Sequence, residues 1–358
     1  KDESNIENLN ILRGNVLETR FPSATFDLGV ANGLVEWVGL MSEGSVDDVY
    51  DNFFREIFRI LKPGGVFYCG IENRYSAYSF FGAIDHSGYR FTNLLPRWMA
   101  NKYCEIRSAS NYLTERDMPG YRTYTFSYHH WKRMMKQHGY EKTTIYGLLP
   151  TYNDIELQCK LEESRGFRFG IEKFIGVSSL KRKILVSLGK IACFFGMQKV
   201  FHPFFGVVNR KPGGEKSASQ IVLPDVVKSK STGEKITSFY LDSQTDKETI
   251  VRKTVRDPAH TPLLEHEIEK IRKLEALNLK SAGLQLPSVQ GTGQERGILY
   301  FDQEHCVGEP MSMFLAKNTF SSSALRDVDC IQQSFDFLEK LADSGDSKGP
   351  AIFIQELM

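Results

Sequence analysis

Polar residues follow two apolar runs in the first 90 residues, at points where each run would end as a strand. Glu72, Asn73 and Arg74 come directly after VFYCGI, and Asn32 and Gly33 come directly after FDLGVA. In an open parallel α/β sheet, ligands bind outside the carboxyl ends of the strands, where side chains reach the ligand and the strands behind stay dry. These residues predict the rim of a ligand site. The alternative is a satisfied polar loop at a sheet edge.

The segments around these residues alternate between strand and helix patterns, which predicts an α/β layer fold for residues 1–154. Strands are predicted at 10–14, 26–31, 66–71 and 143–149. Apolar residues at 50, 53, 54, 57, 58 and 61 share one face of a predicted helix over 48–61. Pro63 is predicted to end that helix, with Gly64-Gly65 reversing the chain.

A second helix is predicted after Ser127, which would cap it, and Gly139 would stop it. His129 and His130 lie on this helix and are predicted to be structural. Trp37 and Trp98 are predicted to lie in the core rather than in a site.

The composition excludes some classes of protein. The 358 residues are enough for two domains, and 45 Lys and Arg nearly balance 44 Asp and Glu, so no global charge selects a nucleic acid. The six cysteines form no C-x-x-C pair, which predicts buried thiols of a reduced, cytoplasmic protein. No signal peptide and no uncharged apolar run of transmembrane length is present, and no metal site is predicted.

Residues 155–219 are predicted to be a mostly helical, basic connector that ends in a linker at 209–219. Between 173 and 216, nine Lys or Arg residues stand against one acid, Glu215, around the apolar run ILVSLGKIACFFGM. One interpretation is a set of helices packed on the first domain with a solvated basic face. The other is a basic amphipathic surface that makes a peripheral contact with an anionic membrane.

The segments GNVLETRFPSATFDLGVANGLVEWVG, an amphipathic helix and ILKPGGVFYCGIENRYS resemble, in that order, the second half of a class I S-adenosylmethionine-dependent methyltransferase. GIENRYS, DHSGYRFTNLLPR and YRTYTFS resemble a subgroup found among genes for cell-surface polysaccharide synthesis. The resemblance covers residues 9–154. It implies an incomplete Rossmann-like sheet and methyl transfer from S-adenosylmethionine to a small-molecule or glycan acceptor.

The resemblance also implies roles for single residues. Asn15 would lie against the adenine, and Asn32 and Gly33 under the methionine part of the cofactor. The family more often has Asp where Asn15 stands, although an Asn amide still hydrogen-bonds the adenine amino group. The residues that would face the acceptor are Glu72, Asn73, Arg74, Asp85 and His86.

Methyl transfer to oxygen needs a base, and His86 oriented by Asp85 is the candidate. The alternative for His86 is an ordinary surface-loop contact. The glycine-rich loop and the ribose-binding acid of the family come from two strands that would precede residue 1, which predicts that this chain is an inactive fragment of a longer parent enzyme. It also leaves the strand predicted at 10–14 without its normal partner.

Residues 220–358 show a different pattern, with strands predicted at 236–242 and 249–255, then a helix at 262–279 and a further strand. TIVRKTV, the helix and ILYFDQEHCVGEPM resemble the N-terminal lobe of the aminoglycoside phosphotransferase and kinase-like family, a small α+β lobe. The resemblance implies ATP and Mg²⁺ as ligands of a complete domain.

In this lobe, the resemblance pairs Lys253 with Glu267 at the nucleotide phosphates, and Glu304 to Cys306 would offer backbone groups to an adenine. Strand alternation places Lys253 on the apolar face with Val251 and Val255, so an acid partner is expected independently. The catalytic His-x-Asp stretch of that family is not in the sequence, and no phosphate transfer is expected from this lobe. A charged surface pair is the plain alternative.

Three functions therefore stay open. The first is a methyltransferase that acts on a sugar or glycan intermediate, the second is a phosphotransferase of the kinase-like fold, and the third is a non-catalytic assembly piece near the membrane. The predicted domains are 1–154, 155–219 and 220–358.

Overall fold

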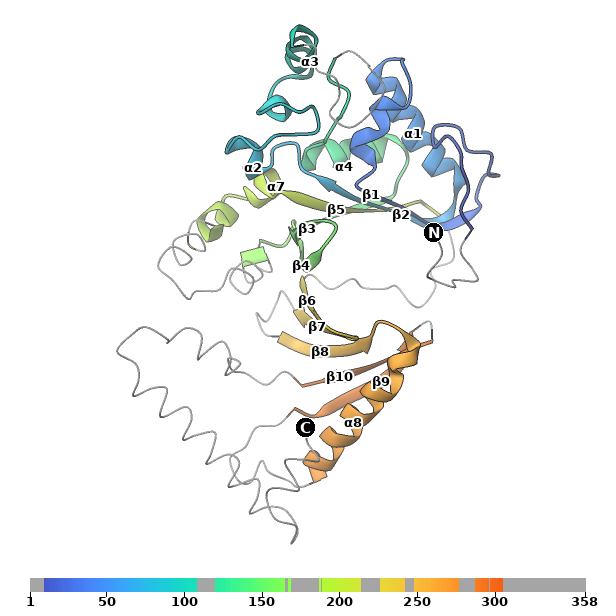
Figure 1. Ribbon diagram of the computed structural model, residues 1–358, viewed down its shortest axis with the longest axis vertical. Coiled ribbons are helices and arrows are strands. Elements are labelled where there is room, and N and C mark those ends of the chain that lie inside the picture. Colours follow the sequence, from blue (N-terminus) through green and yellow to red (C-terminus); the bar gives the residue numbers. More distant parts are fainter. Residues whose placement is uncertain are drawn as a thin grey trace. The chain divides into compact units, whose positions relative to one another are not determined.

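The computed structural model describes residues 10–107, 120–164, 167–168, 187, 189–213, 226–241, 248–276, 287–295 and 297–304 (Figure 1). The chain divides into two compact units. Unit 1 comprises Lys1–Ser164 and Ile191–Leu223, and unit 2 comprises Arg165–Lys190 and Pro224–Met358. The later part of the predicted connector thus belongs to unit 1.

The sheet of unit 1 has the strand order β1-β2-β5-β3-β4. Its strands are β1 (Phe26–Asn32), β2 (Leu61–Glu72), β3 (Lys142–Pro150), β4 (Ile155–Lys160) and β5 (Phe204–Arg210). β1 pairs with β2 in parallel, whereas β5 runs antiparallel to both β2 and β3. The carboxyl ends of β1, β2 and β3 therefore point the same way, as a site at one sheet edge requires.

Two helices cover one side of this sheet, α1 (Val46–Ile60) and α4 (Tyr128–Gln137) (Figure 1). The predicted apolar stripe of α1 is buried at Phe53 and Phe54, and both rings contact Phe67 of β2. Trp131 of α4 packs edge-on against Phe54 at 5.7 Å. Ser127 caps α4 as predicted, because its hydroxyl accepts a hydrogen bond from the His130 amide.

The predicted turn at LKPGG is wrong in part. α1 ends at Ile60, but Leu61 is already extended and pairs with Phe26, so β2 begins before Pro63. Lys62 forms an ion pair with Asp27 at 2.8 Å across the same two strands. The pairing with β1 is then interrupted between Leu61 and Val66, and Gly64 has a left-handed φ of +76° inside this irregular stretch.

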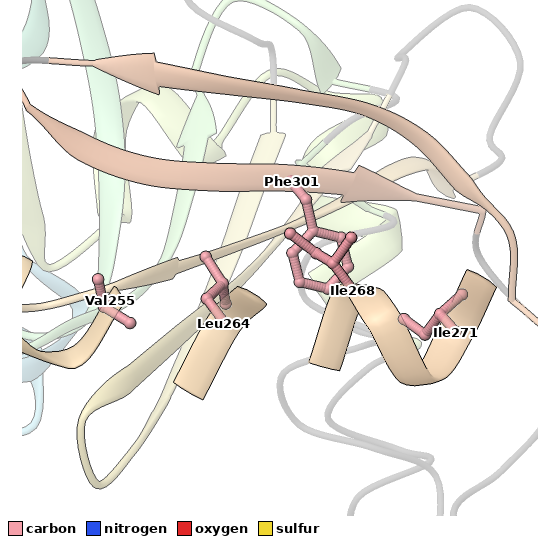
Figure 2. Close-up of a cluster of buried hydrophobic side chains, with 5 residues drawn as sticks. All are labelled: Val255, Leu264, Ile268, Ile271 and Phe301. Carbon is pink, nitrogen blue, oxygen red and sulfur yellow. The ribbon is translucent and has the colours of Figure 1, made fainter. Parts of the chain in front are cut away.

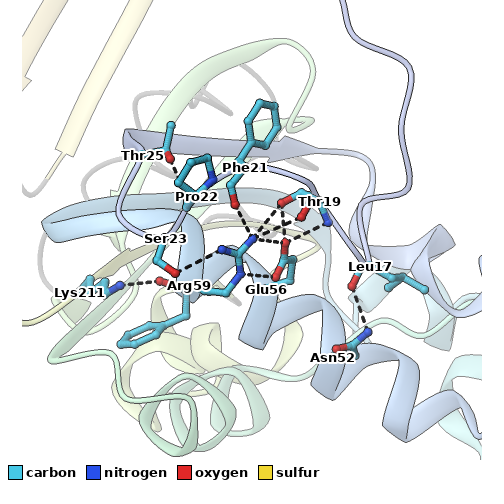
Figure 3. A network of polar contacts seen from close by, with 11 residues as sticks. Leu17, Thr19, Phe21, Pro22, Ser23, Thr25, Asn52, Glu56, Arg59 and Lys211 are labelled. Carbon is cyan, nitrogen blue, oxygen red and sulfur yellow. Dashed lines mark hydrogen bonds and ion pairs between the residues drawn. The ribbon is translucent and has the colours of Figure 1, made fainter.

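The strand predicted at 10–14 is also wrong, since those residues have no regular secondary structure. The following segment is bound to α1 through a polar network (Figure 3). The Thr19 amide donates to Glu56 at 2.9 Å, and Arg59 donates to Glu56 and to the Phe21 carbonyl. The Arg59 hydrogen bond is the largest cause that lowers the pKa of Glu56, to about 2.

Short elements and loops complete unit 1. They are the 3-10 helices η1 (Val35–Leu40) and η2 (Thr92–Leu94) and the helices α2 (Ala77–Phe80), α3 (Arg97–Ile106) and α7 (Gln198–Phe201). The prediction of a mostly helical connector is wrong in the described residues, because β4 and β5 fall inside it. β4 pairs with β3, and β5 pairs with β2 and β3, so both depend on strand pairing that the local pattern did not reveal.

Unit 2 contains five antiparallel strands in the order β6-β7-β8-β10-β9. They are β6 (Val226–Thr232), β7 (Lys235–Leu241), β8 (Glu248–Val255), β9 (Val289–Glu295) and β10 (Ile298–Gln303). The helix α8 (Thr261–Ala276) follows the short turn η3 (Pro258–His260) and packs on the sheet. The core between them consists of Val255, Leu264, Ile268, Ile271 and Phe301 (Figure 2).

Cysteines 69, 104, 159 and 193 are buried free thiols, as predicted for those four. Cys306 and Cys330 lie outside the described residues. In the part of the chain that the structure describes, no helix is long and apolar enough to cross a membrane.

Candidate functional site

Two carboxylates and an imidazole meet at the carboxyl ends of β1 and β2. The Nε2 atom of His86 lies 3.6 Å from Oε2 of Glu72 and 3.8 Å from Oε1 of Glu36. Glu36 is completely buried, while Glu72 and His86 are partly open to solvent. We call Glu36, Glu72 and His86 the acid–imidazole cluster.

Each member comes from a different element. Glu72 is the last residue of β2, and Glu36 lies in η1, which follows β1 after the single turn at Gly33. His86 lies in the loop after α2, where a bridge between Ile84 and Arg90 closes a short hairpin. The separation along the sequence explains why the cluster is not visible as a motif.

The backbone at Gly33 makes this arrangement possible. Its φ of +62° lies in the left-handed region, and its amide donates to the Gly70 carbonyl at 2.9 Å. A Cβ at Gly33 would lie 3.0 Å from the Tyr152 ring, and a Cβ at Gly70 would lie 1.9 Å from Oδ1 of Asn32. Gly33 thus requires glycine for its conformation as well as for close approach, and Gly70 requires it for close approach alone.

The electrostatics of the cluster favour proton uptake. Burial raises the pKa of Glu36, and its own amide hydrogen bond and His86 offset this only in part. Burial likewise raises the pKa of Glu72, with His86 acting in the opposite direction and Asp85 adding to the rise. Carboxylates with raised pKa values can exchange protons closer to neutral pH than ordinary surface acids.

Two polar atoms of the cluster remain without a hydrogen bond among the described residues: Oε2 of Glu36 and Nε2 of His86, both buried. Buried polar atoms are nearly always hydrogen-bonded, so two unpartnered atoms in one cluster indicate a place where a ligand atom can bind. No group of three or more His, Cys, Asp or Glu side chains in the described ranges is arranged to hold a metal ion.

Two aromatic residues border the cluster. The Tyr152 hydroxyl donates to Oε1 of Glu36 at 3.4 Å, and burial raises the pKa of Tyr152, which keeps this donor protonated. The Trp37 ring lies 4.7 Å from the His86 ring, so Trp37 belongs to the site, contrary to the prediction that it is core. The prediction for Trp98 is also wrong, because this side chain is exposed on α3.

Two of the three sequence-predicted cofactor residues, Asn32 and Gly33, lie at the end of β1, whereas Asn15 lies in the segment before β1 that has no regular secondary structure. Asn32 is exposed at the end of β1 and donates to Oδ1 of Asn153 at 3.0 Å. Asn15 is exposed, and its Oδ1 accepts a hydrogen bond from the Leu17 amide. Asn32 and Gly33 thus fit a ligand that lies along the end of β1, whereas the Asn15 amide also serves its own turn.

Two of the predicted acceptor-facing residues, Asn73 and Arg74, hold segments of the fold together instead. The buried Asn73 amide donates to the carbonyls of Val200 and His202, which fastens α7 to the end of β2. Arg74 donates to the carbonyls of Asn93 and Leu95.

Asp85 does not orient His86 as predicted. One of its oxygens accepts from the Ser87 amide and hydroxyl, and the other accepts from the Asn93 amide at 2.9 Å. The carboxylates that flank the imidazole are Glu36 and Glu72. Glu36 was missed by sequence reasoning, although a single acid inside the apolar run LVEWVGL was a usable signal.

The predicted pair in unit 2 is confirmed. Lys253 of β8 forms a salt bridge with Glu267 of α8, on the same face as the buried Val251 and Val255. Lys235 of β7 also binds Glu267, at 2.8 Å. The two lysine hydrogen bonds outweigh desolvation and lower the pKa of Glu267.

The predicted adenine-binding backbone is only partly described. The Glu304 amide donates to the Ser288 carbonyl at 2.9 Å, and its carboxylate accepts from the Ser288 hydroxyl at 3.0 Å. That amide is therefore already used within unit 2. Cys306 lies outside the described residues.

Residues 1–69 match the family described as "Methyltransferase domain". This stretch includes β1, η1, α1 and most of β2, and therefore Glu36. The match covers 69 of the 358 residues of the chain. No curated protein matches the chain.

Several solved structures are similar to the chain at low identity. One is an S-adenosylmethionine-dependent methyltransferase from Thermotoga maritima, a possible histamine N-methyltransferase, with 15% identity over 56% of this chain and 62% of that one, at a TM-score of 0.29. Another is an S-adenosylmethionine-dependent methyltransferase from Archaeoglobus fulgidus, with 10% identity over 57% of this chain and 69% of that one, at a TM-score of 0.30. Phosphoethanolamine N-methyltransferase 2 of Haemonchus contortus has 18% identity over 55% of this chain and 36% of that one, at a TM-score of 0.25. The chain thus spans less than two thirds of the Thermotoga and Haemonchus proteins.

Proposed function

We propose that unit 1 is the acceptor-side part of an S-adenosylmethionine-dependent methyltransferase and that the acid–imidazole cluster binds the methyl acceptor. The observation that carries the proposal is the meeting of Glu36, Glu72 and His86 at the ends of β1 and β2, beside a stretch that matches the methyltransferase domain. Asn32 and Gly33 would hold the methionine part of the cofactor at the neighbouring strand end.

The cluster supplies a proton acceptor for this reaction. S-adenosylmethionine, when bound, supplies an electrophilic methyl group. Nε2 of His86 would take the proton of the acceptor hydroxyl as the methyl-to-oxygen bond forms, and the methyl-to-sulfur bond of the cofactor would break to release S-adenosylhomocysteine. Glu36 and Glu72, at 3.8 and 3.6 Å from Nε2, then stabilise the imidazolium. Trp37 and Tyr152 border this space and restrict water.

The acceptor we propose is a hydroxyl of a sugar or glycan intermediate of cell-surface polysaccharide synthesis. Support comes from the polar lining of the cluster and from the resemblance of GIENRYS and its neighbours to the polysaccharide-associated subgroup. The glycine-rich loop and the ribose-binding acid are not in this sequence, so we propose that full activity needs a longer parent chain.

The test measures S-adenosylmethionine affinity by calorimetry and transfer of a labelled methyl group to oligosaccharides, for this chain and for the longer parent. We expect tight cofactor binding and transfer only from the parent, and transfer is expected to fall in the Glu36→Gln variant. Tight cofactor binding by this chain alone would refute the proposal that the cofactor site needs residues outside this sequence. Transfer to amines but not to hydroxyls would refute the glycan acceptor.

A second candidate function belongs to unit 2. We propose that it is a kinase-like lobe that contributes Lys253 and Glu267 to a nucleotide site when a catalytic lobe is present, with ATP and Mg²⁺ as its ligands. The Lys253–Glu267 salt bridge between a strand and its covering helix favours this function. Binding of a fluorescent ATP analogue that is lost in Lys253→Met but kept in Lys273→Met would support it, and equal binding by both variants would refute it.

A further inference from the structure

Unit 1 exposes a group of large apolar side chains on two neighbouring stretches, which we call the aromatic face. The first stretch is the loop that contains α2, and the second is the turn before α7. Its most exposed members are Phe81, Phe194 and Phe195, at 87%, 79% and 70% exposure. The other members are Tyr78, Phe80, Ile84, Phe91 and Ile191.

The two stretches are joined by direct contact. Phe80 of α2 meets Phe201 of α7 edge-on, with ring centroids 5.3 Å apart, and Tyr78 meets Phe204 at 6.0 Å. Residues 191–197 lead directly into α7. The loop that contains α2 is therefore in contact with α7, which directly follows the turn that carries Phe194 and Phe195.

The backbone holds some of these rings outward. Gly82 has a φ of +79°, and Phe91 has a φ of +66°, which is unfavourable for a bulky residue. The Phe91 ring packs over Gly82, where a Cβ would lie 3.2 Å from it, and still remains nearly half exposed. A strained backbone that presents an aromatic ring to solvent gains nothing from core packing, which suggests a function for the exposed ring.

The charges around the aromatic face are mainly basic. Residues 77–107 contain Arg90, Arg97, Lys102 and Arg107 against two acids, Glu105 and Asp85, of which Asp85 is buried and fully hydrogen-bonded. Residues 191–204 contain Lys199 and no acid. Basic residues beside exposed aromatic rings are the composition that binds an anionic lipid surface.

We propose that the aromatic face docks unit 1 onto an anionic lipid bilayer. Phenylalanine rings would enter the interfacial region while Arg90, Lys102 and Lys199 contact lipid phosphates. A second copy fits less well, because a two-fold contact would bring the same mainly basic residues of both copies together. This inference does not depend on the proposed methyl transfer. The loop that carries the aromatic face also carries His86, so docking would hold the acid–imidazole cluster near the membrane surface.

The experiment measures co-sedimentation of this chain with vesicles of phosphatidylcholine alone or mixed with phosphatidylserine, without S-adenosylmethionine. We expect binding to the mixed vesicles that weakens with added salt. The triple variant Phe81→Ser, Phe194→Ser, Phe195→Ser is expected to bind about tenfold more weakly or worse, since burial of each ring favours binding. The matched control is the double variant Leu28→Ser, Val30→Ser, which removes exposed apolar side chains from β1. It is expected to bind like the unsubstituted chain.

Equal binding by the triple variant and by the unsubstituted chain would overturn the proposal. So would a chain that binds neither vesicle, or a dimer in light scattering that the triple variant dissociates, which would assign the aromatic face to a second copy. Circular dichroism of each variant checks that the fold is retained. Because no cofactor is present, failure here would leave the methyltransferase proposal to its own test.

Discussion

Replacement of Glu267 by Gln is expected to destabilise unit 2 without affecting unit 1. Glu267 is the shared partner of Lys253 and Lys235, whose side chains are 20% and 36% exposed. Removal of one partner of a well-buried pair costs about 3–5 kcal/mol. Partial exposure reduces the Lys253 contribution to about 2 kcal/mol, and the more exposed Lys235 adds about 0.5 kcal/mol. The loss of about 2.5 kcal/mol corresponds to a fall in Tm of about 5–10 °C for a unit of this size.

The three tryptophans make the assay selective. They stand at 37, 98 and 131, all in unit 1, so tryptophan fluorescence follows unit 1 alone while far-ultraviolet circular dichroism follows both units. We expect Glu267→Gln to shift the dichroism transition and to leave the fluorescence transition in place. The matched control is Glu269→Gln on the same helix, which removes an exposed pair with Lys273 and is expected to cause no measurable shift.

The pH dependence gives a second signature. The pKa of Glu267 is lowered in the folded state, so its stabilisation is present above the unfolded pKa of about 4.3 and is lost as the pH falls through the folded value. The difference in the stability of unit 2 between the unsubstituted chain and Glu267→Gln is therefore expected to shrink in acid. Equal shifts for Glu267→Gln and Glu269→Gln, or a difference that persists unchanged in acid, would refute the reasoning.

Three further predictions follow from the same structure. Leu264→Ala, which empties a fully buried position, is expected to cost about 3 kcal/mol in the dichroism transition of unit 2, and a loss below about 1 kcal/mol would mean that the core collapses around it. In the longer chain proposed above, His86→Ala is expected to lower turnover more than cofactor affinity, with the exposed His129→Ala as control, and an unchanged rate would assign the base elsewhere. Burial lowers the pKa of His202 to about 4, so its stabilisation of unit 1 is complete above about pH 6.5 and is lost toward pH 4, by about 3 kcal/mol, as fluorescence-monitored unfolding will show. A His202 resonance that titrates near pH 6.5 in the folded protein would contradict it.

Sequence patterns predicted the elements whose stabilisation is local. α1, α4 and α8 show their apolar stripes, and the Lys253–Glu267 pair follows from strand alternation combined with a helical stripe. β4 and β5 were missed because they are stabilised by pairing with β3, which is distant in sequence for β5.

The candidate site was predicted at its edges and missed at its centre. Glu72 and His86 were found because each stands at a visible boundary of an element. The roles of Asn73 and Asp85 depend on carbonyls and amides of other segments, which residue type does not reveal. Glu36 approaches His86 only because the turn at Gly33 places η1 over the end of β2, a geometry that no spacing rule encodes.

The first strand of unit 1 has a consequence for how the chain behaves in solution. β1 pairs with β2 along one edge, no other described strand lies along its opposite edge, and Leu28 and Val30 are exposed. A strand edge with free amides and carbonyls is a template for another chain's strand. Intermolecular sheet extension at β1 is therefore the expected route of aggregation at high concentration. Solubility of this chain would depend on the seven residues of β1 rather than on its nearly neutral overall charge.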